Sequence, residues 1–416
     1  MTTTTARDWL QLFSNRRIGA TLLLGFSSGL PLALVGGTLQ AWFAQSGVDI
    51  VTIGFLSLVG QPYVYKFLWA PFMDRYVPPL LGRRRGWLLV AQLLLSAAIA
   101  AMALFNPTAT PGALGLVALL AAFLSASQDI AVDAYRADVL RPRERGIGAA
   151  ASVGGYRLAM LVSGGLALIL ADRIGWSAMY LLMAAAMAIG VLGTLLGPEP
   201  ETPASTPRSL SDAVVKPFLE FTTRPAAALL LILIVLYKLG DAFAGSLTMA
   251  FLLKGPGFTL TEIGVVYKTV SLVTTIVGAV FGGTLLAGLG LYRALLLFGI
   301  LQAISNLGFM LLAAAGKSMP LMIGAVAFEN FTGGMGTAAF VALLMALCDH
   351  RYTATQYALL SALSAIGRVF VGPAAGVMVE QLGWEHFFFS TFICALPGIG
   401  LLWMLRAQVR RLEEKA

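Results

Sequence analysis

Long apolar runs, separated by short polar or charged segments, follow one another along the whole chain. An α-helix needs roughly 20 apolar residues to cross a bilayer core of about 30 Å, and each of these runs is long enough. The pattern predicts twelve membrane spans, at residues 18–41, 51–72, 86–105, 112–139, 148–171, 174–197, 225–251, 261–287, 292–315, 319–347, 353–379 and 385–406. We therefore expect an all-α integral membrane protein.

The composition supports this interpretation. Of 416 residues, 58% are hydrophobic and only 12% are charged, against roughly 25% charged residues in a soluble domain. The net charge of +8 does not indicate nucleic-acid binding, because the basic residues gather in particular loops. Cys348 and Cys394 lie in separate apolar runs, and we expect two core thiols without a disulfide framework.

The distribution of basic residues predicts the orientation. Of the 28 Lys and Arg residues, 19 lie on segments that share a side with the N-terminus, 3 lie on the opposite loops, and 6 lie inside spans. Cytoplasmic loops of membrane proteins carry an excess of Lys and Arg. We therefore predict a multi-pass membrane protein with both termini in the cytoplasm.

One linker divides the spans six and six. Prolines at 198, 200, 203 and 207 forbid a continuous helix there. Leu210, Val214 and Phe218 then repeat at the spacing of a short amphipathic helix on the membrane surface. The predicted domains are a six-helix bundle at 1–197, a cytoplasmic linker at 198–224, and a second six-helix bundle at 225–416.

The two halves repeat each other. Arg157 and Arg368 are 211 residues apart, and so are Asp138 and Asp349. Two six-helix repeats joined by a cytoplasmic linker describe the major facilitator fold, in which substrate binds between the halves near the midplane. Asp138 and Asp349 end the fourth span of each half, where we expect them to cap a helix or pair with nearby arginines.

Polar residues inside the fourth span point to transport chemistry. Ser125, Asp129, Asp133 and Arg136 follow one another at intervals of four, four and three, so they share one helix face. Charges at that depth are costly and persist mainly where they line a cavity. We predict Asp129 as the leading proton-coupling residue, Glu329 as the second and Asp133 as the third, although Asp133 could instead form a structural ion pair with Arg136.

Ionisable residues away from the ends of the predicted spans comprise six basic side chains (Lys66, Arg136, Arg157, Lys238, Lys268 and Arg368) and four acidic ones (Asp129, Asp133, Asp241 and Glu329). This excess of basic groups favours an anionic substrate. We predict that Lys238, Lys268 and Arg157 bind its carboxylates. Further candidates for substrate contact are Asp241, Arg136, Tyr63, Gln128 and Asn330. The alternatives are that Asp241 neutralises Lys238, that Arg157 and Arg368 brace helix contacts, that Lys66 reaches the interface, and that the aromatic residues only pack.

The loop after the second span reads Asp74-Arg75, then Gly82-Arg83-Arg84-Arg85. It resembles the facilitator signature between the second and third helices, with Pro71 in place of the usual glycine. The resemblance implies a cytoplasmic gate built from Asp74, Arg75, Arg83 and Arg84. The alternative is a plain basic loop.

Several strings carry a closer resemblance, to the AmpG family of muropeptide permeases. They are Gly25-Phe-Ser-Ser-Gly-Leu-Pro-Leu-Ala-Leu, Gly-Thr-Leu-Gln-Ala-Trp42, Phe67-Leu-Trp-Ala-Pro-Phe-Met-Asp-Arg-Tyr76, Ser125-Ala-Ser-Gln-Asp-Ile-Ala-Val-Asp133 and Leu236-Tyr-Lys-Leu-Gly-Asp-Ala-Phe243. The resemblance runs from about residue 18 to 405. The Ser-Gln-Asp-Ile-Ala-Val-Asp string is shared with related acetyl-CoA transporters.

This resemblance implies proton-driven import of GlcNAc-1,6-anhydro-MurNAc peptides, for peptidoglycan recycling and β-lactamase induction. The expected partners are the anhydro-muropeptide, protons and the lipid bilayer, for a monomer that uses the proton gradient and no cofactor. The alternative is a transporter of acetyl-CoA or another anionic metabolite. An enzyme is not expected, because the chain shows neither a nucleophile–base pair nor a cluster of metal ligands.

Overall fold

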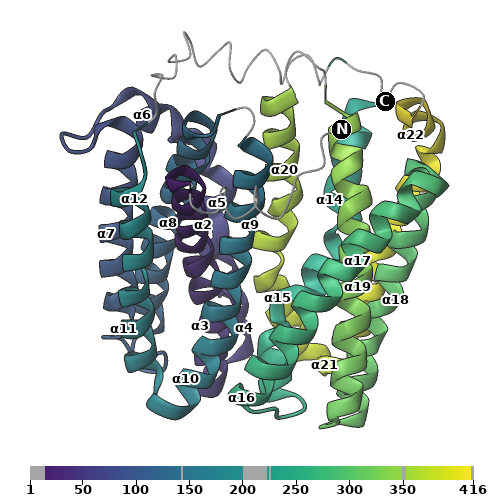
Figure 1. Cartoon of the computed structure of the whole chain (residues 1–416). Helices are drawn as coiled ribbons and strands as arrows, with labels where there is room; N and C mark the ends of the chain where they lie inside the picture. Colours follow the sequence, from purple (N-terminus) through teal and green to yellow (C-terminus); the bar gives the residue numbers. More distant parts are fainter. Residues whose placement is uncertain (1–14, 142–143, 200–222, 224–225, 349–352, 414–416) are drawn as a thin grey trace. The chain divides into compact units, whose positions relative to one another are not determined.

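The computed structural model describes residues 15–141, 144–199, 223, 226–348 and 353–413. Every regular element in these ranges is helical (Figure 1). The predicted amphipathic helix of the linker, and Asp349, lie outside the described residues.

The helices of the first half of the chain are α2 (Arg16–Val35), α3 (Gly37–Gln45), α4 (Ile50–Phe55), η1 (Leu56–Gly60), α5 (Gln61–Tyr65), η2 (Lys66–Leu68), α6 (Ala70–Arg75), α7 (Gly82–Met102), α8 (Pro111–Val139), α9 (Arg145–Leu161), η3 (Val162–Leu166), α10 (Ala167–Ile174), α11 (Trp176–Ala186) and α12 (Ala188–Leu196). The helices of the second half are α14 (Ala227–Tyr237), α15 (Leu239–Lys254), α16 (Leu260–Glu262), η5 (Ile263–Tyr267), α17 (Lys268–Leu289), α18 (Leu291–Ala315), α19 (Met319–Ala346), α20 (Thr353–Phe370), α21 (Gly372–Met404) and α22 (Arg406–Glu413). The turns η1 and η2 are 3₁₀, whereas η3 and η5 are π turns.

The described helices account for the twelve predicted spans. Among the described residues, nine helical segments are long and apolar enough to cross a membrane. The last of them, Leu359–Met404, contains two predicted spans and bends at Gly383, whose φ of 74° favours glycine. The tenth span is the 28-residue helix α19. The second span differs from the expected single helix, since short α and 3₁₀ pieces from α4 to α6 replace it.

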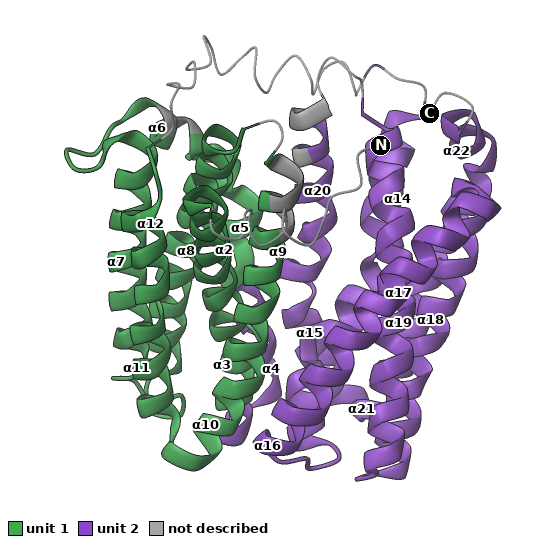
Figure 2. Cartoon of the chain, in the orientation of Figure 1, with its two compact units in different colours: residues 1–42, 59–206 green, residues 43–58, 207–416 purple. Residues whose placement is uncertain are grey.

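Two compact units make up the chain (Figure 2). Unit 1 comprises residues 1–42 and 59–206, and unit 2 comprises residues 43–58 and 207–416. Unit 2 therefore takes a short segment from the first half of the chain. The predicted domain boundaries at 197 and 225 stay a prediction.

Glycines allow very close helix contacts in both units, of which two are examples. In unit 1, a methyl group at Gly25 of α2 would collide with the Ser152 carbonyl of α9. In unit 2, a methyl group at Gly278 of α17 would collide with the Phe331 carbonyl of α19. Small residues permit such backbone approach in membrane helices. The repeat does not relate these contacts, because spans one and five correspond to spans seven and eleven, not to spans eight and ten.

Segment 43–58, the part of the first half of the chain that belongs to unit 2, packs on α21 and its neighbours. Gly54 of α4 meets the backbone of Gly372, and the Ser57 hydroxyl donates a hydrogen bond to the Val369 carbonyl over 2.7 Å. Asp49 caps α4 by accepting from the Thr52 amide. Hydrogen bonds from Thr52 lower the pKa of the Asp49 carboxyl, so this cap is ionised at neutral pH.

Candidate functional site

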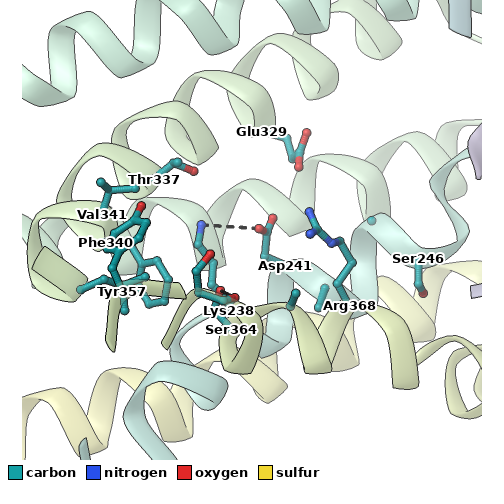
Figure 3. A pocket seen from close by; sticks show the side chains of 15 residues that line it. Lys238, Asp241, Ser246, Glu329, Thr337, Phe340, Val341, Tyr357, Ser364 and Arg368 are labelled. Carbon is teal, nitrogen blue, oxygen red and sulfur yellow. Dashed lines mark hydrogen bonds and ion pairs between the residues drawn. The ribbon is translucent and has the colours of Figure 1, made fainter. Parts of the chain in front are cut away.

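A cavity of about 420 Å³ lies within unit 2 and is lined mainly by α15, α19 and α20 (Figure 3). Four ionisable side chains face it: Lys238, Asp241, Glu329 and Arg368. Hydroxyl and aromatic groups complete much of the wall, among them Ser246, Thr337, Phe340, Tyr357, Ser361 and Ser364. This mixture suits a ligand that carries both charged and hydroxyl groups.

A helix break places Lys238 in the cavity. Lys238 separates α14 from α15, and its backbone, with φ −102° and ψ 1°, leaves the helical range. Asp241 follows in the first turn of α15, where the helix dipole favours a carboxylate. The Lys238 ammonium and the Asp241 carboxylate are 3.7 Å apart, so the predicted neutralising pair is present.

Glu329 is held in place by its neighbour on α19. The Asn330 amide nitrogen donates to the Glu329 carboxylate over 2.7 Å and to the Val326 carbonyl over 2.9 Å. The Asn330 oxygen accepts from the Thr275 hydroxyl over 3.3 Å. Because these bonds occupy its amide, Asn330 orients Glu329 in this structure instead of facing a ligand.

Arg368 offers the cavity a cation that is not neutralised by a contact. Figure 3 shows its guanidinium turned toward the same space as Asp241 and Glu329. Within the described part of the chain, no carboxylate lies within 4.0 Å of it. A planar guanidinium binds carboxylates with two parallel hydrogen bonds.

An aromatic wall lies beside Lys238. The rings of Phe340 and Tyr237 stack with their centroids 5.6 Å apart. The Lys238 ammonium lies 5.9 Å from the Phe340 centroid, within the range of a cation–π contact. Phe340 occupies the position that matches Asp129 in the repeat, so the second unit presents a ring where the first presents an acid.

Asp129 of α8 lies in a separate polar cluster within unit 1. Its carboxylate accepts a hydrogen bond from the Ser28 hydroxyl of α2. Lys66 and the Tyr63 hydroxyl both interact electrostatically with it. Asp129 thus has a cationic neighbour from the broken second span, which the chain pattern did not reveal.

Asp133 and Arg136 form the ion pair that was considered as the alternative. Their charged groups are 3.0 Å apart, and the Arg136 guanidinium also donates to the Ser152 hydroxyl of α9 over 3.3 Å. The Asp133 side chain is 56% exposed. The Arg136 guanidinium therefore already has contacts within the protein, with Asp133 and Ser152.

Gln128 forms hydrogen bonds between two helices of unit 1. It is fully buried, its amide nitrogen donates to the Ser27 carbonyl over 2.9 Å, and its oxygen accepts from the Ser27 hydroxyl over 2.9 Å. This amide joins α8 to α2, and we leave Gln128 out of the proposed substrate site.

The arginine-rich loop makes charge pairs across helices of unit 1. Arg84 pairs with Asp138 at the end of α8 over 2.8 Å, which confirms the expected pairing of Asp138. Arg85 donates to the Thr194 carbonyl over 2.9 Å and lies 3.5 Å from Glu199. Arg75 is exposed, and the side chain of Asp74 lies outside the described residues.

Comparison with known proteins identifies the family. The family model of the Major Facilitator Superfamily matches residues 18–327. The anhydromuropeptide permease of Escherichia coli K12 is 56% identical over 400 residues, which cover 96% of this chain and 82% of that protein. This chain belongs to the anhydromuropeptide permeases of the major facilitator superfamily. A putative transporter AmpG 4 of Rickettsia conorii is 32% identical, with 96% of this chain and 99% of the relative covered.

A solved structure agrees with the fold of this permease. A bacterial homologue of the human lysosomal transporter Spinster, inward-facing and unoccupied, matches with a TM-score of 0.71 at 14% identity, covering 99% of both chains. At this identity the match concerns the fold alone. The family that its relatives identify makes this permease a transporter and not an enzyme.

Three predicted residues of this permease meet in one cavity: Lys238, Asp241 and Glu329. Lys268 is not among the residues that line it, and its ammonium lies 5.2 Å from the Tyr267 ring centroid. Arg157 is exposed on α9 in unit 1.

The sequence interpretation missed the α20 wall of the cavity in this permease. Tyr357, Ser361, Ser364 and Arg368 line it from one helix. Their intervals of four, three and four are those of a single helix face. This polar stripe on an apolar span is a signal that the sequence carries, and of these four residues only Arg368 is among the ionisable residues that the sequence places within the spans.

Proposed function

We propose that this permease imports anhydro-muropeptides, disaccharides of GlcNAc and 1,6-anhydro-MurNAc with or without a stem peptide, across the bacterial inner membrane by proton-coupled alternating access. The high identity to the Escherichia coli anhydromuropeptide permease over 96% of the chain carries this proposal. Import of such fragments would serve peptidoglycan recycling and β-lactamase induction. The acetyl-CoA alternative is not favoured by the relatives.

The unit 2 cavity has the chemistry that this substrate needs. A stem peptide carries carboxylates, for which Arg368 and Lys238 are suitable partners. The sugars carry hydroxyl groups and apolar ring faces, for which the serines of α20 and the rings of Tyr357 and Phe340 are suitable. Lys268, Arg157, Arg136 and Tyr63 remain candidates for the rest of the substrate path.

Proton coupling requires a group whose protonation changes between the two sides of the cycle. Asp129 and Glu329 are the leading candidates, since each carboxylate lies within a predicted span and each has a neighbouring cation, Lys66 or Lys238. Asp133 ranks below them because it is more exposed and is paired with Arg136. The proton gradient is the only driving force proposed, and no cofactor takes part.

Uptake by reconstituted protein tests this function. Purified permease in proteoliposomes should accumulate a radiolabelled anhydro-muropeptide when the lumen is made alkaline, and a protonophore should abolish the accumulation. Excess unlabelled muropeptide should compete with the label, whereas acetyl-CoA should not. Uptake that ignores the gradient would contradict proton coupling, and competition by acetyl-CoA alone would contradict the substrate.

The orientation of the permease in the membrane and its oligomeric state also belong to its proposed function. We propose cytoplasmic termini and a monomer, with the arginine-rich loop 74–85 acting as the cytoplasmic gate. The contact between Arg84 and Asp138 supports the gate, because it ties the third span to the fourth at the basic end of unit 1.

A further inference from the structure

A buried polar seam lies on α18, behind the unit 2 cavity. Asn306 is 1% exposed and Gln302 is 5% exposed. Among the described residues, neither amide atom of Asn306 has a hydrogen-bond partner, and neither does the amide nitrogen of Gln302. A buried polar atom left without a partner costs about 1–3 kcal/mol. Three such atoms together indicate a ligand that supplies hydrogen bonds.

A second, much smaller cavity lies at these atoms. Its volume is about 10 Å³, and its wall includes Asp241, Gln302 and Asn306 together with Tyr237. A single water molecule needs roughly 10–15 Å³ and two to four polar partners. Size and lining therefore both match one water molecule, and they leave too little room for a larger ligand.

The position of Asp241 connects the two cavities. Asp241 lines the large cavity beside Lys238 and also lines the small one. The Gln302 oxygen is already used, since it lies 3.4 Å from the Lys238 ammonium that donates to it. The Gln302 nitrogen is then the end of this amide that is left for the small cavity.

We propose that a resident water molecule in this seam hydrogen bonds Asp241 from the side away from the substrate cavity. The water donates to the Asp241 carboxylate and to the Asn306 oxygen, and it accepts from the Gln302 nitrogen. Asp241 therefore stays hydrated when a substrate fills the large cavity and displaces solvent there. This consequence for transport rests on the proposed function, whereas the water site rests on the geometry alone.

The repeat supplies a control in unit 1. Gln92 of α7 lies 210 positions before Gln302 and is equally buried, with 0% exposure. Its oxygen accepts from the Thr194 hydroxyl over 2.9 Å, and its nitrogen, like that of Gln302, has no hydrogen-bond partner among the described residues. Gln92 thus joins two helices of unit 1, and the change Gln92→Leu removes a buried amide without touching the seam.

Infrared difference spectroscopy of the full chain in nanodiscs, without substrate, tests the site. The probe is water itself, and replacement of ordinary water by H₂¹⁸O identifies its O–H stretching band. We expect an isotope-sensitive band in the wild type and in Gln92→Leu, and its loss in Asn306→Leu, which keeps the branching of the side chain and removes both polar atoms. The same band should shift in frequency in Asp241→Asn. This second variant keeps Asn306, so it tests the water site even if Asn306→Leu fails to fold.

An unchanged band in folded Asn306→Leu, or no shift in Asp241→Asn, would overturn the water site. Neither result involves muropeptide, so failure of the proposed substrate would leave this test intact. In proteoliposomes that do transport muropeptide, Asn306→Leu should reduce gradient-driven accumulation more than substrate exchange between the two sides.

Discussion

At the scale of single residues, the cavity of unit 2 is defined by how its charges are paired. Lys238 and Asp241 form a contact pair, Asn330 holds Glu329, and Arg368 has no carboxylate in contact among the described residues. A cation with no acidic contact is free to form a bidentate hydrogen-bonded pair with an anionic ligand. Arg368 is therefore the side chain whose loss should weaken binding most directly.

We expect Arg368→Gln to weaken muropeptide binding. A hydrogen bond to a charged group contributes about 1.5–3 kcal/mol, so Kd should rise roughly tenfold to hundredfold. Binding of labelled muropeptide to purified protein measures the change. Arg293→Gln is the matched control, since Arg293 is exposed at the start of α18 and does not line the cavity. Equal affinities for all three proteins would remove Arg368 from the site.

We expect Asp129→Asn to uncouple transport from the proton gradient. The variant cannot release a proton at this position, so accumulation should fall to the level seen without a gradient, while exchange of substrate across the membrane continues. Glu329→Gln should show the same separation if both carboxylates take part. Full gradient-driven uptake by Asp129→Asn would show that this carboxylate does not couple protons.

At the scale of elements, both units are organised by glycine-lined helix contacts and by breaks in selected helices. The contact between α17 and α19 places Thr275 within hydrogen-bond distance of Asn330 and so helps to position Glu329. The break between α14 and α15 directs Lys238 and Asp241 into the cavity. Interrupted helices are a recurring way to build binding sites in transporters, because the freed backbone ends carry partial charge.

We expect Gly278→Ala to destabilise the permease and Gly283→Ala to leave it nearly unchanged. Both glycines lie on α17, but only Gly278 faces a backbone carbonyl, that of Phe331, at a distance too short for a methyl group. No atom lies within 4 Å of the methyl group that the second change would add. Overpacking of this kind costs about 1–3 kcal/mol. Thermal unfolding in detergent measures the difference, and equal melting temperatures would mean that the contact yields without cost.

At the scale of the whole molecule, charge asymmetry predicts the orientation in the membrane. The uneven division of 28 basic residues favours cytoplasmic termini. A variant with Cys348 and Cys394 changed to Ser provides the background for single reporter cysteines. In intact spheroplasts, an impermeant thiol reagent should label Lys254→Cys and Lys317→Cys. The same reagent should label Arg293→Cys only after lysis. The reverse pattern would invert the proposed topology.

The sequence by itself determined the membrane setting, the two-half repeat and the family. These properties follow from long apolar runs, from matched spacings and from linear motifs, and none of these features depends on how the helices pack. It also found Lys238, Asp241 and Glu329, because a charge inside an apolar run stands out wherever the helix lies.

Only the tertiary structure decided which polar groups face a cavity and which are consumed by packing. Gln128 is bonded to Ser27 of another helix, whereas Arg368 faces the cavity with no carboxylate in contact among the residues that the structure describes. Whether a polar group faces a cavity or is hydrogen-bonded in the core depends on partners that are far apart in the chain. Gln128 and Ser27, for example, are more than a hundred residues apart. Helical periodicity gives the face on which a side chain lies, but it does not give the neighbour that satisfies the side chain's hydrogen bonds.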